Sequence, residues 1–261
     1  MKHLEGTRRG LLAAAVGLVA VVLLGAQAPK AAPEGAAPEK VARVLFVGNS
    51  YTYANDLPKL VQELAAADRG APRVETEMVA PGGTTLEQHC TTTGALAKVR
   101  EGKFTHVVIQ GQSLETLTQP EKFQKHAKEL ADAAREAGSK VVFYQTWARR
   151  ADAKEYAEKW STGAPKSMQI AISEAYAKAA SSGRGELARV GDAWRGLIES
   201  KDPPPLFDED GSHPSIAGTY LAGCVIYEAI SARDCTKIEL AREGLDSKLA
   251  ARLRKAAHSV R

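Results

Sequence analysis

Serine, histidine and aspartate occur in this chain at positions where together they could carry out acyl transfer. Ser50 follows an apolar run, Val44 to Val47, and the turn Gly48-Asn49, while His213 closes the segment Asp210-Gly-Ser-His213 far along the chain. A serine hydroxyl becomes a nucleophile when a base removes its proton. Histidine can be that base when an acid holds its other ring nitrogen and stabilises the imidazolium. One loop turn can bring the Asp210 carboxylate back to the His213 ring.

Acyl transfer also needs hydrogen-bond donors for the negative oxygen that develops on the attacked carbonyl. Three candidate donors follow apolar segments: the backbone N–H of Ser50, the backbone N–H of Gly83 in Gly82-Gly83, and the side-chain amide of Gln112. Gln110 is a rival for the role of Gln112, because it stands two residues earlier in Gln110-Gly-Gln-Ser113.

These residues must be positioned by strands that alternate with helices. Apolar runs bounded by turn residues predict strands at 44–47, 74–79, 106–109, 140–144 and 187–190. Helical periodicity and capping residues predict helices at 56–68, 86–100, 120–137, 166–180, 192–200, 215–231 and 245–260. The alternation predicts a three-layer α/β fold with about five parallel strands and helices on both faces. Ligands bind such sheets beyond the carboxyl ends of the strands, where Ser50, Gly83 and Gln112 would lie.

Each candidate also has an ordinary structural explanation. A serine after a strand is often a helix cap, Asp210-Gly211 is typical of a turn, and Gly82-Gly83 could be only a turn. Purely structural roles for all of them would require that every element reach the same end of the sheet by coincidence. His89 and Cys90 resemble a metal pair, but no further ligands have suitable spacing, so we predict no metal and no cofactor.

The first 40 residues have the composition of an export signal and a tether. Residues 1–28 combine a basic start, an apolar run from Leu11 to Leu24 and Ala26-Gln-Ala28, and they predict a signal peptide. Thr7-Arg8-Arg9 adds a weak twin-arginine signal. Residues 29–40 are rich in alanine and proline and predict a linker, which leaves 41–261 as a single domain. Export to the periplasm, cell surface or medium is expected, without stable membrane insertion after cleavage; the alternative is an uncleaved anchor.

Net charge bears on nucleic-acid binding, and the cysteine positions bear on a possible disulfide. The formal net charge is +4, and part of it lies in the leader, so the composition gives no support for binding to nucleic acid. Of the three cysteines, Cys224 and Cys235 could form a disulfide only if the intervening helix ends and the chain folds back; otherwise both are buried thiols.

The order of motifs resembles the SGNH (GDSL-like) hydrolase superfamily. Gly48-Asn49-Ser50 resembles its first block, which usually has aspartate before serine; Gly83 resembles its glycine block, and Asp210-Gly-Ser-His213 its last. The resemblance spans residues 43–231. It implies a flavodoxin-like three-layer fold, no metal, Ser50 as nucleophile, His213 as base and Asp210 as the residue that orients it. Gly83 and position 112 would be oxyanion donors.

The third block departs from the family pattern, because Gln112 stands where asparagine is usual. A glutamine amide donates the same hydrogen bond but is one methylene longer. The resemblance implies an ester hydrolase for a small-molecule or carbohydrate ester, with Asn49, Tyr51, Gln110 and Trp147 as candidate substrate-lining residues. The alternative is a weak or inactive protein of the same fold that binds glycan or cell-wall material. A flavin or nucleotide binder is disfavoured, because no glycine-rich phosphate loop follows the first strand.

Overall fold

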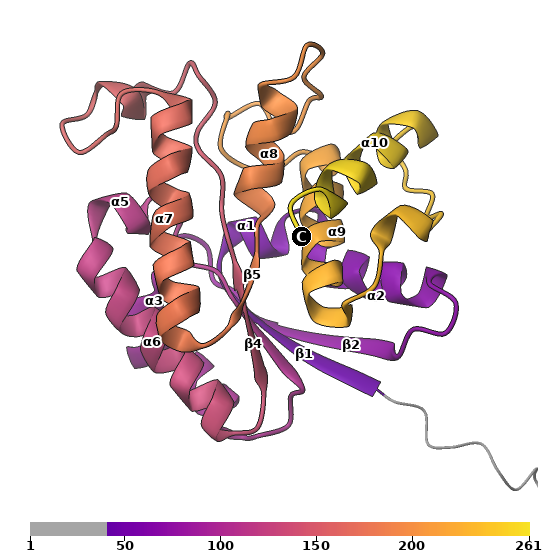
Figure 1. The fold of residues 1–261 in the computed structure, drawn as a ribbon. Coiled ribbons are helices and arrows are strands. Elements are labelled where there is room, and N and C mark those ends of the chain that lie inside the picture. The colour runs from indigo at the N-terminus through magenta and orange to yellow at the C-terminus, as the bar shows by residue number, and fades with distance from the viewer. Residues whose placement is uncertain (1–40) are drawn as a thin grey trace, which may run out of the picture. The chain divides into compact units, whose positions relative to one another are not determined.

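The computed structural model describes residues 41–261, so the predicted signal peptide and linker lie outside the described residues (Figure 1). Five strands form one sheet: β1 Val41–Val47, β2 Arg73–Val79, β3 His106–Ile109, β4 Lys140–Tyr144 and β5 Glu186–Ala188. Every adjacent pair is parallel, and the order is β2-β1-β3-β4-β5. This is the flavodoxin-like order, with its switch point between β1 and β3. The predicted parallel α/β fold is confirmed.

Burial along the strands explains this order. The four residues of β3 are all buried, as are residues 44–47 of β1, which is typical of central strands covered on both faces. In contrast, β2 alternates apolar with acidic residues and stays partly exposed, as expected of an edge strand.

Successive strand side chains point to opposite faces and build two cores. On one face, Val44, Phe46 and Val108 pack with residues of four helices. These helices are α2 Leu57–Ala67, α8 Val190–Ile198, α9 Ile216–Ser231 and α10 Ser247–His258. On the other face, Leu45 and Ile109 pack with a second set. It consists of α3 Leu86–Thr91, α4 Ala95–Arg100, α6 Pro120–Glu136 and α7 Pro165–Gly183. Figure 1 shows α6 and α7 on one side of the sheet and α9 on the other.

Two one-turn helices were not predicted. α1 Ser50–Tyr53 begins at Ser50 itself, about five residues before the predicted helical pattern, and α5 Glu115–Thr118 follows β3. A four-residue helix is too short to show a hydrophobic period, so its formation depends on tertiary contacts. None of the helices formed by residues 41–261 combines the length and apolar character needed to cross a membrane.

The cysteines are free thiols, one of the two alternatives expected for them. α9 ends at Ser231, and Ala232 takes a left-handed conformation with φ of 57°, so the chain does fold back before Cys235. Cys224 and Cys235 are fully buried in the core that contains α9.

Candidate active site

A tight turn after β1 positions Ser50. A Cβ at Gly48 would lie 2.2 Å from Thr52 Oγ1, so a side chain there would block the turn. Asn49 then caps α1, because its Oδ1 accepts a hydrogen bond from Tyr51 N at 3.2 Å. Ser50 is the first residue of this helix, at the carboxyl end of β1.

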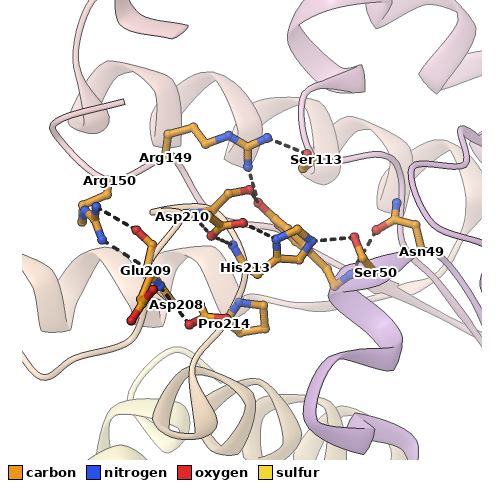
Figure 2. A network of polar contacts seen from close by, with 12 residues as sticks. Asn49, Ser50, Ser113, Arg149, Arg150, Asp208, Glu209, Asp210, His213 and Pro214 are labelled. Carbon is orange, nitrogen blue, oxygen red and sulfur yellow. Dashed lines mark hydrogen bonds and ion pairs between the residues drawn. The ribbon is translucent and has the colours of Figure 1, made fainter. Parts of the chain in front are cut away.

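The loop 208–214 positions Asp210 and His213. Asp208 N donates to His213 O at 2.8 Å, and Asp210 Oδ1 accepts from Ser212 N at 2.9 Å and from His213 N at 2.8 Å. Arg150 holds the loop from outside. Its backbone N–H donates to Gly211 O at 2.9 Å, and its guanidinium donates to the carbonyl oxygens of Asp208 and Glu209 (Figure 2).

These two segments bring Ser50, His213 and Asp210 into one line of contacts, which Figure 2 shows. His213 Nε2 lies 2.9 Å from Ser50 Oγ, and His213 Nδ1 lies 2.5 Å from Asp210 Oδ2. Burial by itself would raise the pKa of Asp210. The hydrogen bonds from the His213 side chain and from two backbone N–H groups outweigh it and hold that pKa at about 2. A charged carboxylate, an imidazole and a hydroxyl in this order can move a proton away from Ser50 Oγ.

Stacked aromatic rings support the His213 loop. The Tyr51 and Trp147 rings are parallel with centroids 4.5 Å apart, and Trp147 stacks on Trp194 at 4.0 Å. Tyr51 meets the His213 ring edge-on at 5.5 Å. Trp147 Nε1 donates to Ser212 O at 3.0 Å, so the stack also contacts the loop backbone.

Arg149 is a site residue that the sequence analysis missed. It is 7% exposed, and its guanidinium donates to Ser113 Oγ at 2.9 Å (Figure 2). The guanidinium also donates to Tyr51 Oη and to Glu155 Oε1, the latter at 3.2 Å. Burial raises the pKa of Tyr51, and the nearby Arg149 charge opposes this shift only in part. Tyr51 therefore keeps its proton, which it can donate to Ser212 Oγ at 2.8 Å. Arg149 lies in an irregular segment with no periodic signal, so only the folded structure reveals it.

Asn49 connects the segments that carry the three predicted oxyanion donors. Asn49 Nδ2 donates to Thr84 O and to Gly111 O, each at 3.3 Å, so the neighbour of Ser50 contacts the neighbours of both Gly83 and Gln112. Within residues 41–261, the N–H groups of Ser50 and Gly83 and the side-chain NH₂ of Gln112 have no protein hydrogen-bond partner. Gln112 Oε1 accepts from Leu114 N at 2.8 Å, which leaves the NH₂ end of this amide for a ligand.

Gln110 differs from Gln112 because its amide already has partners. Its Oε1 accepts from Asn49 N at 3.1 Å and from Thr52 Oγ1 at 2.9 Å, and its Nε2 donates to Asn49 Oδ1 and to Gly111 O. The structure therefore makes Gln112 the better donor candidate. The candidate substrate-lining residues do not reach the surface of the site. Each of them is at most 2% exposed: Asn49, Tyr51, Gln110 and Trp147. Their polar and aromatic groups are used in packing beneath the site.

His89 supports the turn before Ser50 from beneath. It is fully buried, with Nε2 at 2.8 Å from Gly48 O and Nδ1 at 3.0 Å from Thr93 Oγ1. Burial lowers the pKa of His89, so the ring is neutral and supports the turn before Ser50. Two groups of donor side chains in the described part of the chain have metal-like spacing, and neither contains a predicted site residue. They are Cys90, His126 and Glu129, and Glu228, Asp234 and His258.

No family model matches the chain, and no curated protein matches it. Among solved structures, a protein from Slackia heliotrinireducens assigned to the SGNH hydrolases is 31% identical, with a TM-score of 0.64, and the match covers 74% of this chain and 100% of that one. A DUF4886 family protein from Bacteroides uniformis is 20% identical, with a TM-score of 0.68, over 85% of this chain and 95% of that one. An acetylxylan esterase from Geobacillus stearothermophilus is 13% identical, with a TM-score of 0.57, over 77% and 97% of the two chains. The last two likenesses show a common fold.

Proposed function

The chain belongs to the SGNH hydrolase superfamily, and from this premise we propose that it is an exported serine hydrolase that cleaves carboxylic esters. The observation that carries the proposal is the line of contacts from Asp210 through His213 to Ser50 Oγ. A base 2.9 Å from a hydroxyl, itself held by a carboxylate, is the arrangement that nucleophilic acyl transfer requires.

In the proposed first step, Ser50 Oγ attacks the ester carbonyl and His213 Nε2 takes the hydroxyl proton. The carbonyl π electrons move to its oxygen, which the N–H groups of Ser50 and Gly83 and the amide of Gln112 stabilise. The intermediate then expels the alcohol, which takes the proton from His213, and an acyl-serine remains. Asp210 stays ionised and stabilises the imidazolium throughout.

In the second step water replaces the alcohol. His213 Nε2 removes a proton from the water, whose oxygen attacks the acyl carbonyl. Collapse of the second intermediate releases a carboxylic acid and returns the proton to Ser50 Oγ. Loss of one oxyanion donor typically costs ~10²- to 10³-fold in rate, so the rate depends on how well Gln112 reaches the oxyanion.

For the substrate class we propose O-acyl groups, acetyl in particular, on carbohydrate. The acetylxylan esterase among the structural neighbours acts on such a substrate by its name. Tyr53 supports the choice, because it lies three residues after Ser50 and is 45% exposed, so its ring can stack on a sugar. Export rests on the composition of residues 1–28; N-terminal sequencing of the secreted protein would test it.

A fluorophosphonate serine probe tests the proposed chemistry. The purified protein, Ser50→Ala, His213→Ala and the control Ser181→Ala, an exposed serine of α7, are treated and examined by mass spectrometry. We expect one adduct on Ser50, retained in the control and lost in both site variants. The same four proteins are then assayed for acetate release from acetylated xylooligosaccharides.

An unlabelled wild-type protein that is folded by circular dichroism would contradict the proposal. The alternative reading, a binding protein of the same fold, would then predict glycan binding that survives Ser50→Ala. Labelling of Ser50 without acetate release would keep the hydrolase and reject the acetyl-carbohydrate substrate.

A further inference from the structure

Glu115 is a buried carboxyl group that no step of the proposed mechanism uses. It is the first residue of α5 and is 1% exposed. Both of its oxygens accept from Leu86 N, at 3.1 and 3.2 Å, and Oε2 also accepts from Gln112 N at 2.9 Å. One side chain therefore bonds to the backbones of two segments that lie far apart in the sequence, the start of α3 and the loop after β3.

Both of these loops carry proposed oxyanion donors. The glycine loop, residues 80–85, contains Gly83 and runs directly into Leu86, the first residue of α3. The glutamine loop, residues 110–114, contains Gln112, whose own N–H donates to Glu115. The glutamine loop is closely packed at Gly111, since a Cβ there would lie 2.7 Å from the Phe123 ring of α6 and 3.2 Å from Glu115 Oε2. A shift of the carboxyl group would move the backbone on which Gln112 depends.

We propose that Glu115 is a positioning residue that holds the glycine loop and the glutamine loop together, so that the donors on Gly83 and Gln112 reach one oxyanion. The role rests on the proposed function, because it matters only if an oxyanion forms at Ser50. Asn49 joins the same two loops through their carbonyl oxygens, at Thr84 and Gly111. Glu115 joins them through their N–H groups, which Asn49 Nδ2 cannot do because it is a donor.

The ionised carboxylate suits this role better than a neutral amide. It accepts on both oxygens, whereas a glutamine at this position would offer one acceptor oxygen and an NH₂ group facing N–H donors. The titratable groups that face Glu115 are Glu87 and Cys90 on α3 and Tyr176 on α7, and none of them is cationic. Burial is the largest influence and outweighs the backbone N–H bonds, so the pKa of Glu115 is raised to about 7.

A raised pKa makes activity and stability respond to pH in opposite directions. The folded protein holds the Glu115 proton more tightly than the unfolded chain, so its stability falls as pH rises from the ordinary pKa of 4.5 to about 7 and then levels off. Over the same range the carboxylate forms and accepts all of its hydrogen bonds. We therefore expect the oxyanion donors to become better placed while the fold becomes less stable.

The test compares the wild-type protein with Glu115→Gln and with the control Glu174→Gln, an exposed glutamate of α7. The rate of fluorophosphonate labelling and the kcat and KM for 4-nitrophenyl acetate are measured from about pH 5 to about pH 9. We expect Glu115→Gln to lose ~10²-fold in kcat at about pH 8 with KM little changed. The ratio of the wild-type rate to the Glu115→Gln rate should rise through about pH 7, because only the wild-type protein carries this carboxyl group, whereas its ratio to the control rate should stay constant.

Two further measurements test the positioning role of Glu115 without an activity assay. Hydrogen exchange should be faster in segments 80–86 and 110–114 of Glu115→Gln and unchanged in the control, a change that does not depend on activity. Between about pH 5 and about pH 7 the thermal midpoint of the wild-type protein should fall relative to that of Glu115→Gln, and above about pH 7 the difference should stay constant. If Glu115→Gln does not fold, Glu115→Asp, which keeps the charge but is one methylene shorter, is expected to show the same loss of kcat.

The outcomes separate the two proposals. A wild-type protein that is not labelled at Ser50 contradicts the proposed function, and this role of Glu115 with it. A wild-type protein that is labelled, with a Glu115→Gln variant that reacts and exchanges hydrogen equally fast, contradicts only the positioning role.

Discussion

Asp210 contacts His213 twice, once through each carboxylate oxygen. Oδ2 lies 2.5 Å from the ring Nδ1, and Oδ1 accepts the backbone N–H of His213 at 2.8 Å. The ring and its own backbone are therefore held by the same carboxylate, only three residues earlier. This double contact, together with the bonds from Arg150 and Trp147 to the loop backbone, orients the ring so that Nε2 faces Ser50.

Asp210→Asn should lower kcat by ~10⁴-fold while the fold is retained, as triads lose activity when the carboxylate is replaced. The asparagine amide can still accept from the backbone through Oδ1, but its NH₂ would face Nδ1 and favour the wrong tautomer. Steady-state kinetics and circular dichroism measure the two effects. Asp208→Asn, in the same loop but bonded to His213 only through its backbone, is the matched control.

The pKa of Asp210 also predicts part of the pH profile. Because it lies at about 2, the carboxylate stays ionised above about pH 3, so protonation of Asp210 should not limit wild-type activity at any higher pH. The protonation of Asp210 can be followed through its carboxyl resonance. If the labelling rate falls above about pH 3 in step with this protonation, Asp210 has a higher pKa than expected and the prediction is wrong.

Gln112 should behave as an oxyanion donor whose reach matters. Gln112→Ala is expected to lower kcat by ~10²- to 10³-fold with a small effect on KM, because the donor acts mainly on the transition state. Gln112→Asn should be intermediate, since the amide remains but is one methylene shorter. The backbone N–H to Glu115 is present in both variants, so the loop should stay in place. Equal rates for wild type and Gln112→Ala would remove Gln112 from the mechanism.

The central strands could be predicted from the sequence, since Val44 to Val47 and Val107 to Ile109 are apolar on both faces and are followed by turn residues. The segments with Ser50, Gly83, Gln112 and His213 were expected at one end of that sheet, and the structure brings Ser50 and His213 into contact. The choice between Gln110 and Gln112 could not be made from the sequence. Both follow β3, and only the turn at Gly111 decides which amide is buried under Asn49.

Other site residues gave no signal in the sequence because their roles depend on distant partners. Arg149 lies in an irregular charged segment, and its partners Tyr51 and Ser113 come from the ends of two other strands. Glu115 belongs to a one-turn helix that has no hydrophobic period. Tyr51 and Trp147 were candidates for lining the substrate site, but aromatic rings near strand ends are more often packed, and these two stack on each other.

The cysteine chemistry can be tested by counting thiols. Cys224 and Cys235 are free and fully buried, and burial raises the pKa of Cys90 to about 12, so all three should react slowly with iodoacetamide in the native protein. The unfolded protein should give three thiols. A count of one, restored to three by a reductant, would show that Cys224 and Cys235 are oxidised to a disulfide in the purified protein.

Asn49→Asp should destabilise this protein, although aspartate is the more usual residue of the first block in the family. Asn49 Nδ2 donates to the carbonyl oxygens of Thr84 and Gly111, both at 3.3 Å, and the residue is 2% exposed. An ionised aspartate would place a carboxylate oxygen against two carbonyl oxygens in a buried site. We expect a loss of about 1–3 kcal/mol in the free energy of unfolding at neutral pH, measured by urea denaturation, together with slower labelling of Ser50.

The same variant should recover stability in acid. A protonated aspartic acid can donate one of the two lost hydrogen bonds, so the pKa of the new carboxyl group should lie above the usual value near 4. Its folded state would hold the proton more tightly than the unfolded chain, and the destabilisation should therefore shrink as pH falls below about 5. Asn49→Ala, which also loses both bonds but adds no charge, is the control and should show no such recovery. If Asn49→Asp loses the same free energy of unfolding at every pH, the two hydrogen bonds donated by Asn49 Nδ2 are not the reason why this position requires an amide.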